Sequence, residues 1–267
     1  MRKNQGRVLV IAGSDSGGGA GIQADIKAIT VTGGFAMTAV TAITAQNTLG
    51  VFDVHPIPLA TIAKQIECVA SDIGVDIVKT GMLGSVEVVE LVAQSLAQYS
   101  SQAPCVIDPV MIAKGGHPLL EERAISAVRD LLIPKAFLLT PNAPEAESLT
   151  NIKINNLDDQ RQAAEALLML GANAVLLKGG HVDSEIITDL LATTSGEVLF
   201  QSKRIESTST HGTGCTLASA IASYLAQGDD LEVAVKKARE YVFGAIENAK
   251  GFGKGHGPLN HGWVLVL

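Results

Sequence analysis

The chain has 267 residues, a formal net charge of −7, one Trp and three Tyr. A layered α/β domain reaches this length alone, although most domains have roughly 100 to 200 residues. The net negative charge, the lack of any Lys/Arg run and the few aromatic residues argue against nucleic acid or an anionic membrane as a partner. A small molecule is therefore the expected partner.

Cysteine usage and the N-terminus predict a cytoplasmic protein. The three cysteines are too few for a disulfide framework, and none form a CxxC pair. The first apolar run is short and ends in a glycine-rich loop, so no signal peptide is expected. The uncharged stretch 28–52 is interrupted by Thr, Gly, Gln and Asn, which favours buried sheet over a membrane span.

Short Val- and Ile-rich runs alternate along the chain with helical patterns. Strands are predicted, in chain order, at 7–13, 37–45, 75–81, 104–110, 136–142 and 173–180. Helices are predicted at 21–32, 59–72, 85–98, 121–131, 157–170, 213–227 and 230–249. The alternation predicts a doubly wound, mostly parallel α/β sheet with helices on both faces. A hairpin of 186–193 with 197–205 is expected at one edge. With no repeat, linker or shift in composition, residues 1–267 are predicted to form a single domain.

The loop after the first strand, GSDSGGGAGIQAD at 13–25, is rich in glycine and opens a helix. Ligands of such sheets bind beyond the carboxyl ends of the strands, and glycines allow a close backbone approach. A dinucleotide site is disfavoured because the next strand ends in TAITAQNT, without an acidic residue for a ribose. The loop is either a ligand site for another class of molecule or simply a tight turn.

The stretch STHGTGCTLASAIASYL at 209–225 places glycines and a cysteine where a helix begins. Backbone amides at a helix N-terminus stabilise an anion, so Gly212, Thr213 and Gly214 are candidates for an anion hole. The same field lowers the pKa of a thiol, so Cys215 is expected to ionise near neutral pH. The alternative is a small buried side chain, which is also the expectation for Cys68 and Cys105.

Two acidic residues follow neighbouring strands. Asp108 comes after CVID and Glu145 lies in TPNAPEAE, so both carboxylates are expected at one edge of the sheet. Mg²⁺ needs only one or two carboxylates when phosphates supply further ligands, whereas an acid in such a place can also simply cap a helix.

The chain resembles the hydroxymethylpyrimidine/phosphomethylpyrimidine kinases of thiamin synthesis, which have a ribokinase-like fold. The resemblance runs nearly end to end, and its carriers are AGSDSGGGAGIQADIKA, TAITAQNT, KTGML, DPVM, TPNAPEAE, LKGGH, THGTGCT and GKGHGPLNH. The cysteine of THGTGCT is the most specific of them, because most ribokinase-like enzymes have an aspartate base at that position. The first loop departs from the family pattern, because Ser16 stands where a proline is expected, and this predicts a more flexible loop.

The resemblance implies a role for individual residues. Gln46, Asp25 and the backbone around Ala20 are expected to bind the pyrimidine, with Met82 and Val110 beside its ring. Cys215 corresponds to the proton-handling group above the anion hole of 212–215. The remaining roles are metal binding for Asp108 and Glu145, and contact with ATP phosphates for Asn142, Lys178 and Thr210. Lys254 either lies near the nucleotide or is simply solvated.

The implied activity is transfer of the ATP γ-phosphoryl group, with Mg²⁺, to the pyrimidine's hydroxymethyl oxygen and then to the resulting monophosphate. A homodimer is the expected assembly. Two other functions stay open: a pyridoxal kinase of the same subfamily, and a non-catalytic ligand-binding domain that kept the pocket. The retained glycines, Cys215, Asp108 and Glu145 speak against the latter.

Overall fold

The computed structural model describes residues 5–99, 102–112, 119–181 and 185–265. Within these residues a nine-stranded sheet has the order β3-β2-β1-β4-β5-β6-β7-β8-β9. The strands are β1 (Arg7–Asp15), β2 (Phe35–Asn47), β3 (Gly50–Pro56), β4 (Ile77–Thr80), β5 (Cys105–Ile107), β6 (Leu138–Leu139), β7 (Ala174–Leu177), β8 (Ile186–Thr193) and β9 (Gly196–Lys203).

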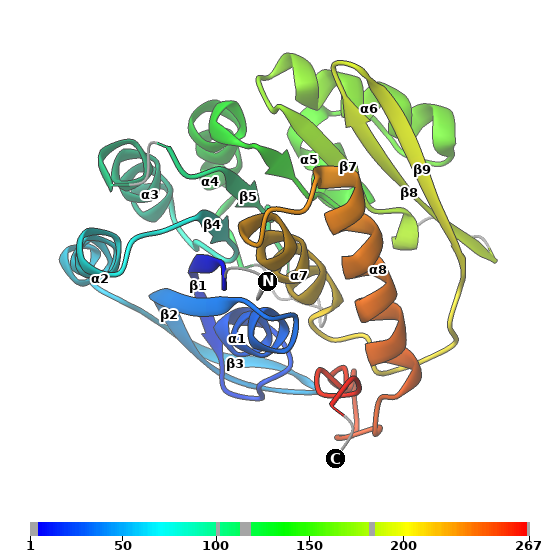
Figure 1. The fold of residues 1–267 in the computed structure, drawn as a ribbon, viewed down its shortest axis with the longest axis horizontal. Coiled ribbons are helices and arrows are strands. Elements are labelled where there is room, and N and C mark those ends of the chain that lie inside the picture. Colours follow the sequence, from blue (N-terminus) through cyan, green and yellow to red (C-terminus); the bar gives the residue numbers. More distant parts are fainter. Residues whose placement is uncertain (1–4, 100–101, 113–118, 182–184, 266–267) are drawn as a thin grey trace.

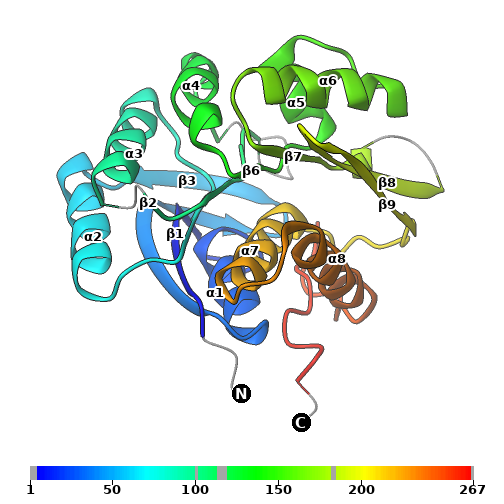
Figure 2. The same cartoon turned by 45° about the horizontal axis from the view of Figure 1, so that its top comes forward.

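Helices lie on both faces of this sheet. They are α1 (Gly21–Val31), α2 (Leu59–Asp72), α3 (Val86–Tyr99), α4 (Glu122–Ala127), α5 (Ala143–Thr150), α6 (Leu157–Met169), α7 (Thr213–Ala226) and α8 (Leu231–Glu247). Figure 1 shows α7 over the middle of the sheet with α1 and α8 beside it, and Figure 2 shows α2 to α6 on the opposite face. In the described ranges, no helix is both long and apolar enough to cross a membrane.

The predicted fold class is confirmed, with differences at both edges. Six strands, in the sheet order β2-β1-β4-β5-β6-β7, pair in parallel, because strand and crossover helix alternate along most of the chain. The expected hairpin is present as β8 and β9. A second antiparallel edge was not predicted: β3 pairs with β2 after a short turn. β5 and β6 are shorter than the predicted strands, and α4 continues as π-helical and 3-10 turns up to Lys135.

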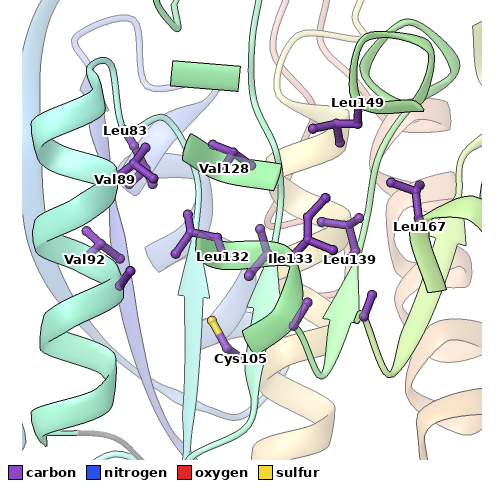
Figure 3. Close-up of a cluster of buried hydrophobic side chains, with 14 of the residues drawn as sticks. Leu83, Val89, Val92, Cys105, Val128, Leu132, Ile133, Leu139, Leu149 and Leu167 are labelled. Carbon is purple, nitrogen blue, oxygen red and sulfur yellow. The ribbon is translucent and has the colours of Figure 1, made fainter. Parts of the chain in front are cut away.

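The central strands β1, β4, β5, β6 and β7 are buried almost throughout because each face of the sheet is covered there. One core lies under α2 to α6 and contains Cys105 beside Val92 and Leu132, as Figure 3 shows. The other lies between the sheet and α1, α7 and α8. The expectation that Cys105 is a packing residue is confirmed by its full burial. Cys68 lies on α2 and is exposed, so the same expectation is wrong for that residue.

Candidate active site

A cavity of about 1160 Å³ opens at the carboxyl ends of the central strands. Its position follows from the topology, because loops there leave a crevice that no crossover helix covers. Thirteen of the fourteen predicted site residues line it: Ala20, Gln46, Met82, Asp108, Val110, Asn142, Glu145, Lys178, Thr210, Gly212, Thr213, Gly214 and Cys215. The exception is Asp25.

The N-terminus of α7 forms one wall of the cavity. Gly212 caps the helix with φ 83°, a left-handed conformation that favours glycine. A Cβ at Gly212 would collide with the carbonyl oxygen of Gly19, so the first loop and the start of α7 are in direct contact. Thr213 Oγ1 donates to the carbonyl of Thr210 at 2.8 Å and fixes this turn. The first-turn amides of α7, which lack helical partners, are therefore held at the cavity.

Cys215 lies where it was expected, but its protonation state differs from the expected one. The residue keeps some exposure to the cavity, yet protein surrounds its sulfur, and this burial raises the pKa of the thiol to about 12. The carboxylates of Asp25 and Asp108 act in the same direction, against the lowering effect of Lys79 and of the Gly21 backbone amide. The predicted ionisation near neutral pH is therefore wrong. Desolvation of a thiolate outweighs the helix field here.

Asp25 does not contact the cavity, so the expected contact with the pyrimidine is corrected. Its side chain on α1 is fully buried and forms an ion pair with the equally buried Lys79 of β4, at 2.9 Å. Ser219 of α7 donates to the same oxygen at 2.6 Å. Asp25 lies on the buried face of α1, beside Ala24, Ala28 and Ile29, and therefore faces the core rather than the loop.

Lys178 lies between the two predicted metal-binding carboxylates. Its Nζ is 3.2 Å from Asp108 Oδ1 and 3.9 Å from Glu145 Oε2. Thr140 Oγ1 also donates to Asp108 Oδ1, at 3.1 Å. Both carboxylates raise the pKa of Lys178 against the opposing effect of burial, so the ammonium stays charged. The expectation that Asp108 and Glu145 lie together at one sheet edge is correct.

Glu145 also caps a helix. Its Oε2 accepts from the backbone amide of Asn142 at 2.8 Å, and the side chain of Asn142 accepts from the Glu145 amide at 2.9 Å. This capping box begins α5, a helix that was not predicted. Burial, together with the negative charge of Asp108, raises the pKa of Glu145 to about 7. The structure thus combines the two alternatives weighed for this residue, a cap and a carboxylate at the cavity.

These acidic groups fit a divalent cation bound with phosphates. Asp108 Oδ2 is buried and has no hydrogen-bond partner in the described ranges, and an orphaned carboxylate oxygen is a ready ligand for a hard cation. The part of the chain that the structure describes holds no cluster of three or more His, Cys, Asp or Glu arranged as a metal site. The two carboxylates present would fit Mg²⁺, which commonly takes only one or two carboxylates from the protein.

Gln46 lines the cavity together with Met82 and Val110. Its Oε1 accepts from Thr44 Oγ1 at 3.1 Å, and its Nε2 lies 3.3 Å from His211 Nε2. The bond from Thr44 therefore orients the amide, whereas His211 Nε2 donates to the Asp15 carboxylate and cannot also accept from Gln46. An amide fixed in this way can pair with adjacent donor and acceptor atoms of a flat ring.

Two functional candidates escaped the sequence analysis, Asp15 and His211. Asp15 accepts from the amides of Gly17, Gly19 and Ala20, and its Oδ2 lies 2.8 Å from His211 Nε2. Burial acts against ionisation of Asp15, but the bond from His211 and those from the backbone prevail and lower its pKa. The pair joins the first loop to the start of α7. An aspartate ahead of three glycines is a signal for such a turn.

Ser16 stabilises the first loop where greater flexibility was expected. Its hydroxyl donates to the carbonyl of Gln46 and accepts from the amide of the same residue, both at 2.8 Å. These two hydrogen bonds tie the loop to β2 and so restrain it, although the proline expected at this position is absent. Lys254 is exposed and lies outside the cavity as the described residues define it, which agrees with the solvated alternative.

The cavity extends further than the predicted residues, toward β9 and α8. Asp189 of β8 accepts from the Gly179 amide at 2.8 Å and from Arg239 Nε at 2.7 Å. The Arg239 guanidinium stacks over the ring of Phe200, 5.6 Å from its centre. This lobe offers an aromatic ring and cationic groups beside Lys178, and its residues carry no motif of their own.

Comparison with known proteins identifies the family. The sequence model described as phosphomethylpyrimidine kinase matches residues 15–260. The chain belongs to the phosphomethylpyrimidine kinase family. The hydroxymethylpyrimidine/phosphomethylpyrimidine kinase of Bacillus subtilis is 48% identical over 96% of this chain and 94% of its own. The thiamine biosynthesis bifunctional protein ThiED of Geobacter sulfurreducens is 51% identical over 96% of this chain, which spans only about half (52%) of that relative.

Solved structures confirm the ribokinase-like architecture of this family member. The pyridoxal kinase of Bacillus subtilis, solved as an ADP complex, aligns with a TM-score of 0.91 and 35% identity. The alignment covers 99% of this chain and 100% of that one. The family is thus close in fold to kinases of another six-membered heterocycle.

Proposed function

We propose that the chain phosphorylates 4-amino-5-hydroxymethyl-2-methylpyrimidine with ATP and then phosphorylates the resulting monophosphate to the diphosphate, as a step of thiamin synthesis. One observation carries the proposal. A single cavity is lined by the Gln46 amide, by the α7 amides with Cys215, and by Lys178 with two carboxylates. Gln46 lies beside His211, just before α7, and Lys178 lies beside Gly214 in the first turn of that helix. Family membership supports the same conclusion.

The two ends of the cavity suit the two substrates. The Gln46 end offers donor and acceptor atoms in one plane with apolar side chains from Met82 and Val110, which suits a methylated aminopyrimidine. The lobe between Lys178 and Phe200 offers cationic groups and an aromatic face, which suits the phosphates and base of a nucleotide. Cys215 lies between them, where the hydroxymethyl oxygen and the γ-phosphoryl group would meet.

In the first transfer, the hydroxymethyl oxygen attacks the γ-phosphorus, its bond to the ADP oxygen breaks, and the hydroxyl proton leaves. The amides of 212–215 and the Lys178 ammonium stabilise the negative charge of the transferring group. Asp108 and Glu145 would hold Mg²⁺, which would neutralise charge on the ATP phosphates. Positioning and electrostatics account for most of the catalysis, so the demand on Cys215 is restricted to the hydroxyl proton.

In the second transfer, the acceptor is already a phosphate monoester, and its attacking oxygen carries no proton at neutral pH. Cys215 is therefore needed less in this step. The site must instead accept an additional dianion beside the γ-phosphate. The α7 amides and Lys178 supply the compensating positive potential.

A pyridoxal kinase is the second candidate, favoured by the close structural match to the Bacillus subtilis enzyme. A screen of hydroxymethylpyrimidine, its monophosphate and pyridoxal with Mg-ATP tests both proposals. Phosphorylation of the two pyrimidine compounds supports the first. Turnover of pyridoxal alone would replace it by the second, and no ATP turnover with any of them would indicate a ligand-binding domain.

The proposal extends to organisation and location. We propose that residues 1–267 act as a single kinase domain in the cytoplasm and form a homodimer. Exposed apolar side chains gather at the β2–β3 edge, including Ile43, Leu49 and Phe52, the last 70% exposed, and a second copy could cover them. Light scattering of the purified protein distinguishes a dimer of about twice the chain mass from a monomer.

A further inference from the structure

A charged cluster lies behind Cys215, sealed from the cavity. Lys79 of β4 and Asp25 of α1 are both 0% exposed and pair at 2.9 Å. Asp25 Oδ2 is buried and, in the ranges that the structure describes, has no hydrogen-bond partner. Replacing a buried ion pair by apolar side chains is often neutral or even stabilising. Stability is therefore a weak reason for this pair.

Cys215 lies on the face of α7 that turns toward this cluster. Ser219, which donates to Asp25 at 2.6 Å, lies four residues after Cys215 on α7, so both side chains are on the same helix face. The Lys79 ammonium lies 3.1 Å from where a Cβ on Gly81 would be, and Gly81 lines the cavity together with Cys215. Glycine at position 81 thus leaves the lysine close behind the cavity wall.

We propose that Lys79 and Asp25 are positioning residues for Cys215: the enclosed ammonium group favours a negative charge on the sulfur, and the carboxylate opposes it. The inference rests on the proposed role of Cys215 in the first transfer. A neutral thiol cannot accept the hydroxymethyl proton. The buried sulfur can form a thiolate only if a nearby cation compensates its charge. Lys79 is such a cation, and it is enclosed by protein rather than open to the nucleotide.

Four charged side chains, each from a different part of the sheet or α1, influence the charge of the sulfur. Lys79 comes from β4, Asp25 from α1, Asp108 follows β5 and Lys178 follows β7. The Gly21 amide at the start of α1 adds a donor. Asp108 and Lys178 are open to the cavity, so ligands alter their effect. The sealed pair exerts a constant effect, and its two members act with opposite sign.

The experiment measures alkylation of Cys215 by iodoacetamide between pH 7 and 10.5, with mass spectrometry to assign the site. All proteins carry Cys68→Ser, because Cys68 is exposed, and a further Cys215→Ser variant gives the background. Asp25→Asn is expected to accelerate alkylation of Cys215 on the order of tenfold at fixed pH, and Lys79→Met to slow it by a similar factor, because an opposite charge shifts a neighbouring pKa by about 1 to 3 units. Lys64→Met, which removes an exposed lysine from α2, is the matched control and should change nothing.

Buried single-charge variants sometimes fail to fold, so Asp25→Asn with Lys79→Met is tested too, since it leaves no unpaired charge. This double variant is expected to match the slow Lys79→Met rate, because burial raises the pKa of Asp25 and its carboxylate takes up a proton once Lys79 is gone. Wild-type alkylation rates in the folded variants, or shifts of equal sign in both single variants, would overturn the inference. The readout needs no turnover, so an inactive wild-type protein would refute the proposed function and leave this measurement valid.

Discussion

Two lysine–aspartate pairs flank the same cysteine and differ in what they can reach. Lys178 and Asp108 keep 14% and 2% exposure and lie at the cavity, whereas Lys79 and Asp25 are completely enclosed. In each pair the second carboxylate oxygen lacks a hydrogen-bond partner within the described residues. In the open pair, the unpaired oxygen of Asp108 can bind a ligand or a cation. The sealed pair can act only through its neighbours, which include the sulfur of Cys215.

The first prediction concerns Cys215, the residue that lies beside both pairs. Cys215→Ala should slow the first transfer by roughly 10²- to 10⁴-fold, as for loss of a positioned acid/base group. It should slow the second transfer less, because that acceptor oxygen is already ionised. Steady-state rates with each acceptor measure the ratio. Cys68→Ala on α2 is the control, and equal loss in both transfers would show that the sulfur only fills space.

A second substitution tests the open pair. Lys178→Ala should lower kcat of both transfers by roughly 10²- to 10³-fold, the loss typical for a donor to a developing charge. Lys254→Ala removes a lysine outside the cavity and should leave the rates unchanged. If Lys178→Ala affected only one acceptor, the lysine would be binding that acceptor rather than the transferred group.

The third prediction concerns the end of the cavity away from both pairs. Gln46→Leu should weaken pyrimidine binding by about 1 to 3 kcal/mol for each ring atom left unpaired, without changing nucleotide affinity. Calorimetry with each ligand measures the two affinities. Gln94→Leu, on the exposed face of α3, is the matched control. Unchanged pyrimidine affinity would remove Gln46 from the substrate site.

The smallest expected effect is a loss of folding stability at low pH, and it arises at His261 rather than at Cys215. Burial, aided by the charge of Lys27, lowers the pKa of His261 from 6.5 to about 4, and its Nε2 lies 2.9 Å from Thr216 Oγ1 on α7. Because the folded pKa lies below the unfolded one, protonation favours unfolding, and stability is lost as pH falls from 6.5 toward 4. The linkage amounts to about 2 kcal/mol between pH 7 and pH 5.

Urea unfolding of wild type and His261→Asn at the two pH values tests this linkage. The variant should show a smaller pH dependence than the wild type. An equal pH dependence in both proteins would show that groups other than His261 cause the loss of stability.

Local patterns predicted the layers of the fold but not its antiparallel edge. Alternating strand and helix signals predicted the parallel strands, because these strands are rich in Val, Ile and Leu and each crossover helix is periodic. β3 was missed because its pairing with β2 depends on a turn at Thr48 and Leu49, and the uncharged stretch around it has no period of its own. α5 was missed although its capping box was legible in the spacing of Asn142 and Glu145.

The same division holds for the site. Position along the chain placed Cys215 at a helix start and Asp108 after a strand, and the structure agrees. The protonation of Cys215 was mispredicted because it depends on burial and on charges from α1, β4 and the loop after β5. Asp15 and His211 meet although 196 residues separate them. Neither effect has a local signature, because both arise only when distant loops pack together.

The central claim is that one cavity carries out two successive transfers. Phosphorus NMR of the protein with the pyrimidine monophosphate and Mg-ATP tests it most directly. The account predicts new resonances of a diphosphate ester that grow as ADP accumulates. An unchanged monophosphate, in a preparation that phosphorylates pyridoxal rapidly, would contradict the account and favour the pyridoxal kinase.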